Sequence, residues 1–105
     1  MQIELLIDGQ KKKFTAPFVP MLAKRKFLEI EARIEERTEP LPLKEQIAED
    51  DEIFAILTDI VFKNQFTLEQ LFEGASKEYI DQKLTEAIFG IKPKKQDDEG
   101  NDQGE

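Results

Sequence analysis

The fold is decided near the start of the chain, where residues 2–15 read QIELLIDGQKKKFT. Ile3, Leu5 and Ile7 recur at every second position, as they would on the buried face of a strand. Asp8-Gly9 follows, and this pair favours a two-residue type I′ turn, which needs a positive φ at both central positions. The stretch therefore predicts an antiparallel β-hairpin.

The turn also fixes the register of the two strands. It sets Ile3 opposite Phe14 and Glu4 opposite Lys13, an apolar pair and a pair of opposite charges that both stabilise antiparallel strands. A lone hairpin is only marginally stable in water, so we expect this one to pack on helices.

Helices are predicted to follow the hairpin. Prolines bound a corner at residues 16–20. Apolar residues cover most of the circumference of residues 53–62, which is typical of a central helix. Thr67 and Gln70 have the spacing of a capping box, and Ser76 is a candidate N-cap for the last helix. From these signals we predict helices at about 20–37, 43–64, 67–74 and 76–90.

The end of the chain has a different composition. Residues 92–105 contain no apolar side chain and are rich in charge, which predicts a disordered acidic tail. The expected architecture is a single α+β domain over residues 1–91, in which an N-terminal antiparallel hairpin packs on about four α-helices.

The composition limits the classes of function. The chain contains no cysteine and no histidine, which removes thiolate zinc sites, cysteine nucleophiles and the commonest general base near neutral pH. Its net charge of −8 argues against a nucleic-acid partner, because phosphates reward a positive surface. We therefore expect a protein that is not an enzyme and that uses no metal or cofactor.

Targeting signals are weak in this sequence. The first residues, Met1 to Glu4, lack the basic segment and apolar run of a signal peptide. The most apolar stretch, residues 53–62, is too short to span a bilayer. We expect a cytoplasmic protein that has no membrane partner.

Clustered carboxylates leave two alternatives open. Asp50, Asp51 and Glu52 could be metal ligands of an enzyme, but consecutive helical positions point in different directions, so a solvated helix start is the better interpretation. The other alternative is an acidic inhibitor that mimics DNA, or another inhibitory protein-binding module. A DNA mimic would use an array of carboxylates that includes Glu45, Glu49, Glu52 and Asp59, although apolar residues interrupt that array.

Apolar side chains are the candidate binding residues. A small core absorbs most of the eight phenylalanines, but complete burial is hard around a helix–loop–helix joint and at a corner bounded by prolines. Exposed apolar patches on soluble proteins mark partner sites, so we predict that some of these side chains line an exposed groove. The predicted partner-binding residues are Phe18, Met21, Phe62, Phe66, Leu68 and Phe72.

The order of these elements resembles that of tail assembly chaperones of long-tailed, siphovirus-type phages or prophages of Gram-positive bacteria. The similarity rests on hairpin residues 2–10, on FTAPFVP at residues 14–20, and on FTLEQL at residues 66–71, which follows the apolar helix. In layout it extends over about residues 1–91.

This resemblance implies a function. Proteins of that kind bind the tape-measure protein, keep it soluble and help the tail-tube protein polymerise around it, and they are absent from the finished virion. Many of these phages also make a longer form by ribosomal frameshifting, for which Lys94-Lys95 would mark the slippery site. Self-association of the chain stays open.

Overall fold

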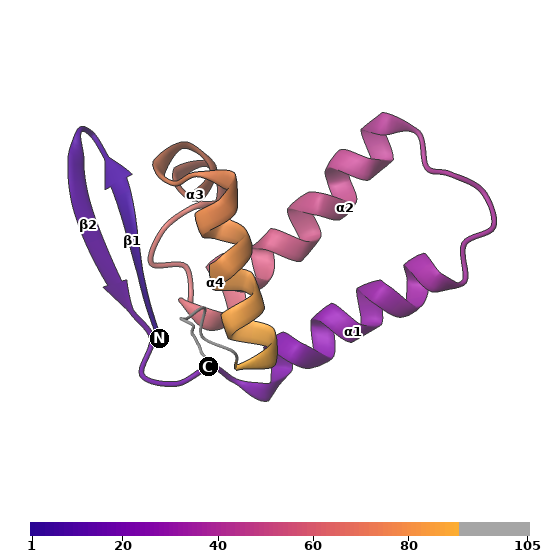
Figure 1. Ribbon diagram of the computed structural model, residues 1–105, viewed down its shortest axis with the longest axis horizontal. Coiled ribbons are helices and arrows are strands. Elements are labelled where there is room, and N and C mark those ends of the chain that lie inside the picture. The colour runs from indigo at the N-terminus through magenta and orange to yellow at the C-terminus, as the bar shows by residue number, and fades with distance from the viewer. Residues whose placement is uncertain (91–105) are drawn as a thin grey trace, which may run out of the picture.

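Strands β1 (Gln2–Ile7) and β2 (Gln10–Thr15) form the predicted antiparallel hairpin in the computed structural model, which describes residues 1–90 (Figure 1). Ile3 lies opposite Phe14 and Glu4 lies opposite Lys13, so the predicted register is confirmed. The turn residues have positive φ, 53° for Asp8 and 77° for Gly9. The predicted tail at residues 92–105 and the Lys94-Lys95 pair lie outside the described residues.

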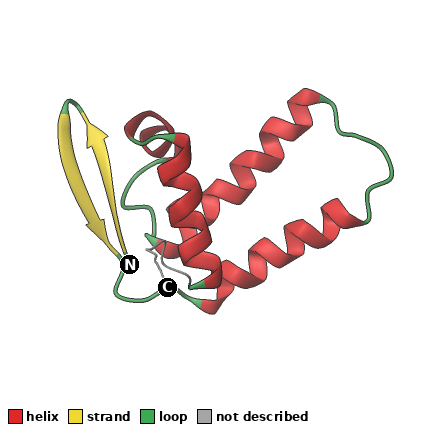
Figure 2. Ribbon diagram, in the orientation of Figure 1, coloured by secondary structure: helices red, strands yellow, loops and turns green. Residues whose placement is uncertain are grey.

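The helices of the fold follow the hairpin, and Figure 2 shows them beside its two strands. Their caps match the sequence signals: the Thr67 side chain accepts a hydrogen bond from the Gln70 backbone, and the Ser76 side chain accepts one from Tyr79. The prediction of an α+β fold with an N-terminal hairpin and four α-helices is confirmed. The helices are α1 (Met21–Glu35), α2 (Leu43–Ala55), α3 (Leu68–Gly74) and α4 (Lys77–Phe89).

The second helix differs from the prediction in its last part. It was predicted as one helix to about residue 64, but α2 ends at Ala55 and the π-helical segment η1 (Ile56–Val61) continues it. The Phe62 N–H donates to the carbonyl of Leu57, five residues earlier, at 2.9 Å. The buried Thr58 hydroxyl donates to the Ala55 carbonyl at 3.3 Å, and such a bond competes with the regular helical ladder.

The core lies where the hairpin, η1, α3 and α4 meet, and Ala23 and Ile30 of α1 also pack into it. Gly74 marks the closest approach, because a Cβ at that position would lie 2.9 Å from the Leu6 backbone oxygen. A glycine there lets α3 pack directly on β1. The largest fully buried side chains are those of Ile3, Leu5, Ile30, Ile56, Leu57, Val61, Phe62 and Leu71.

Helices α1 and α2 extend away from this core as an arm, and a loop joins their far ends (Figure 1). In α1 only Ala23 and Ile30 are buried, and every side chain of α2 is exposed or half-buried. No helix within residues 1–90 is long and apolar enough to cross a membrane.

Candidate partner-binding surface

An apolar stripe runs along one side of α2. Leu43 is 75% exposed and Ile47 is 62% exposed, while Phe54 is half-buried where the helix reaches the core. These residues are spaced by four and seven positions, and side chains at those intervals lie on the same side of a helix. Leu43 and Ile47 are therefore exposed to water, and they do not contribute to the buried core.

The stripe leads into a pocket at the base of α3 and α4. Phe54 meets Phe72 of α3 edge to face, with ring centroids 5.7 Å apart, and the pocket has a volume of about 220 Å³. Figure 1 shows α3 next to the start of α4, and α2 extending away from these two helices. We call the combined surface the α2–α3 trough; it consists of Leu43, Ile47, Phe54, Phe72, Ala75 and Ile80.

Charged side chains border the trough. Lys77 and Asp81 line its pocket and form an ion pair at 2.9 Å, and this hydrogen bond from Lys77 to the Asp81 carboxylate raises the pKa of Lys77. Asp50 and Asp51 lie between Ile47 and Phe54 on α2, and neither forms an ion pair within residues 1–90. The α2 side of the trough is therefore acidic between Ile47 and Phe54, which favours a partner with basic side chains next to its apolar ones.

Ion pairs hold α2 against α1 and so position one wall of the trough. Arg37 binds Glu49 at 2.5 Å, and Arg33 binds Glu52 at 2.6 Å. Lys26 also reaches Glu52, at 3.4 Å. The hydrogen bond from Arg37 lowers the pKa of Glu49, and the bond from Arg33 lowers the pKa of Glu52.

These lowered pKa values predict that acid loosens the arm. The stabilisation by Glu49 and Glu52 is complete above the ordinary glutamate pKa of about 4.3, and it is lost as the pH falls below that value and the carboxylates are protonated. Hydrogen exchange should show lower protection factors for the α2 amides at about pH 3.5 than at pH 7. The Glu49→Gln/Glu52→Gln variant should show the same loss at neutral pH. Equal loss of protection in α4 would contradict a local effect.

Two of the predicted binding residues are in the core. Phe62 has no exposed surface, and Phe66 is 3% exposed. The Phe66 ring packs against Phe62 at 5.3 Å between centroids and against Phe14 of the hairpin at 4.9 Å. The exposed placement predicted for these two rings is therefore wrong, because the hairpin and η1 enclose the joint.

The other four predicted residues keep exposed surface but do not gather at one place. Phe72 is 44% exposed and belongs to the trough. Leu68, one turn earlier on α3, is half-buried and lines a neighbouring hollow with Ala55 and Thr58. Phe18 is exposed at the corner before α1, Met21 is exposed at the first position of α1, and both lie outside the trough.

Sequence reasoning missed the α2 part of the trough. The pattern at Leu43, Ile47 and Phe54 is visible in the sequence, and Asp50 and Asp51 between them indicate a water-facing side. The helix predicted at 43–64 was inferred from its strongly apolar residues 53–62 alone, so the stripe on its first half was not recognised.

The carboxylates suggest no other chemistry in the described part of the chain. Within residues 1–90, no three acidic side chains are grouped so that they could hold a metal ion. Of the array considered for a DNA mimic, Glu49 and Glu52 are paired with Arg37, Arg33 and Lys26. These two carboxylates therefore pair with cations of the same chain and are not free to bind a partner.

Comparisons with known proteins add one positive finding. A family model described as "Phage tail chaperone protein" matches residues 1–105, the whole of the chain. No curated protein and no solved structure matches it.

Proposed function

Since the chain belongs to the phage tail chaperone protein family, we propose that it binds the tape-measure protein of its phage and keeps that protein soluble until the tail assembles. In the same role it assists polymerisation of the tail-tube protein. It acts in the cytoplasm of the bacterial host, is left out of the mature virion and performs no catalysis.

The α2–α3 trough is the observation that carries this proposal. Leu43 and Ile47 are exposed along a helix, and the pocket at Phe54 and Phe72 gives the surface a concave end. An amphipathic helix of the partner would lay its apolar face on such a surface, as helix-in-groove complexes do. A long helical client supplies faces of this kind.

Charge supports the same mode of binding. The chain has a net charge of −8, which keeps a complex with an apolar client soluble. Asp50 lies in line with the stripe between Ile47 and Phe54, and Asp51 lies beside it; both favour clients with lysine or arginine next to their apolar residues. A DNA mimic is less well supported, because Glu49 and Glu52 are neutralised within the arm.

Co-expression tests this function directly. The chain is expected to keep the long helical protein encoded beside its gene in the soluble fraction and to copurify with it. Expression of that client alone, and with an unrelated acidic protein of similar size, provides the controls. A client that precipitates equally in all three cases would rule out the proposed role.

A further inference from the structure

A second apolar stripe lies on α1, on the side that faces away from the core. Met21 is 72% exposed, Leu28 is 48% exposed, and Ala32 is exposed between charged neighbours. Their spacing of seven and four residues places them on one side of the helix, and the buried Ala23 and Ile30 lie on the opposite side. We call Met21, Leu28 and Ala32 the α1 stripe.

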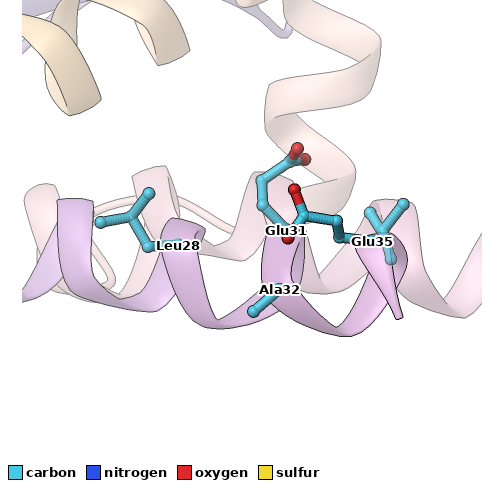
Figure 3. A pocket seen from close by; sticks show the side chains of 5 residues that line it. Leu28, Glu31, Ala32 and Glu35 are labelled. Carbon is cyan, nitrogen blue, oxygen red and sulfur yellow. The ribbon is translucent and has the colours of Figure 1, made fainter. Parts of the chain in front are cut away.

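The surface around the α1 stripe is hollowed. An open hollow of about 460 Å³ is lined by Leu28, Glu31, Ala32, Ile34 and Glu35. Figure 3 shows Leu28, Glu31, Ala32 and Glu35 along α1, with the carboxylates of Glu31 and Glu35 on one side of the helix in this view and Ala32 on the other. An apolar centre with carboxylates beside it is thus open to contact from outside.

Charge changes sign along α1. Lys24, Arg25 and Lys26 come first, and Glu31 and Glu35 come last, with Arg33 between these two glutamates and paired to Glu52 of α2. This order is the reverse of the one that the helix macrodipole favours, which is acidic at the N-terminal end and basic at the C-terminal end. These charges therefore do not stabilise the macrodipole of α1 within the single chain.

Ion pairs within the chain account for only part of these charges. Arg25 binds Glu29 at 3.1 Å, and Lys26 binds Glu52. Lys24, Glu31 and Glu35 form no ion pair with any residue of the described range 1–90. One cation before Leu28 and two anions after it are left for an external partner.

We propose that the α1 stripe binds a second copy of this chain, with the two α1 helices antiparallel and a twofold axis at Leu28. Residues four before and four after Leu28 then meet, so Lys24 lies between the partner's Glu31 and the partner's Glu35. The same pairs form again on the other side of the axis. An isologous contact requires this kind of self-complementary surface.

The contact also explains the charge order of α1. Antiparallel packing brings the basic first half of each helix beside the acidic second half of the other, and it sets the two macrodipoles in opposition. Leu28 packs on the partner's Leu28 at the centre, where charge would be costly. The dimer leaves the α2–α3 trough of each copy free, because that surface lies on other helices.

The expected dimer is weak. Two helices of 15 residues bury less than the roughly 1,600 Å² of a standard interface, so we expect a dissociation constant of about tens of micromolar. Its exposed ion pairs make it salt-sensitive. Sedimentation equilibrium of the full chain at low and high salt should show this dimer, and Leu28→Glu should weaken it at least about 100-fold while circular dichroism stays unchanged.

Charge reversal gives a sharper test. Lys24→Glu alone, and Glu31→Lys/Glu35→Lys alone, are each expected to weaken self-association about tenfold, because like charges then meet across the axis. An equimolar mixture of the two variants should dimerise about as well as the parent chain, since every reversed charge meets its opposite. A structural effect of either variant would not be rescued by mixing.

Cross-linking locates the axis. The chain has no cysteine, so Leu28→Cys creates a single thiol that is expected to form a disulfide-linked dimer under mild oxidation. Lys44→Cys, exposed on α2, should stay uncross-linked and serves as the control. The proposal is overturned if the chain stays monomeric at millimolar concentration, or if Leu28→Glu loses its client instead of its dimer, which would assign the stripe to another protein.

Discussion

Replacement of Leu43 and Ile47 by glutamate is expected to abolish copurification of the tape-measure protein. Both side chains are mostly exposed, so the double variant should fold normally. Two carboxylates in the centre of an apolar contact lose the packing of both residues and must be desolvated when the client binds. A loss of about 3 kcal/mol or more, which is at least about 100-fold in affinity, is reasonable for two central interface residues.

A control with the same charge change is available on the same helix. Lys44→Glu alters the net charge by −2, as Leu43→Glu/Ile47→Glu does, but it changes no apolar residue of the trough. It is expected to keep the client soluble. If both variants lose the client equally, charge rather than apolar contact governs binding, and the trough is not the site.

Phe62→Ala is expected to have the largest effect on stability. The ring is fully buried and packs on Phe66, so its removal leaves a cavity and costs about 3–5 kcal/mol. For a domain of this size, this loss lowers the melting temperature by about 12 °C or more. Phe72→Ala should cost only about 1 kcal/mol, because it removes one aromatic contact from a partly exposed ring.

The two phenylalanine variants separate folding from binding. Urea denaturation measures their stability, and client copurification at a temperature where both variants are folded measures their function. Phe72→Ala should weaken client binding, whereas Phe62→Ala should retain it while folded. A Phe62→Ala variant as stable as the parent would show that this ring is not enclosed as the structure has it.

The hairpin could be predicted in detail because its signals are local. Asp8-Gly9 sets the turn, and the register at Ile3 and Phe14 follows from the turn. The caps at Thr67 and Ser76 were also readable, since each depends on residues within one helical turn. That residues 1–91 form one domain stays a prediction.

Which phenylalanines are buried and which are exposed could not be predicted in the same way. Phe66 is buried because Phe14, distant in sequence, covers it, and single-sequence patterns carry no information on such contacts. The same holds for the ion pairs between Arg37 and Glu49, which decide where α2 lies. Only Phe72 of the predicted binding residues belongs to the trough.

The attachment of α2 gives the trough an adjustable width. Its outer part is held by the ion pairs of Glu49 and Glu52 rather than by interlocked apolar side chains. Dispersion contacts lose about a quarter to a half of their energy when atoms separate by about 0.5–1 Å, whereas the attraction between charges declines gradually with distance. The outer part of α2 can therefore move outward when a bulky client side chain binds and move back when a small one binds. A binding surface of adjustable width suits a client whose successive segments are all apolar on one face but differ in the size of their side chains.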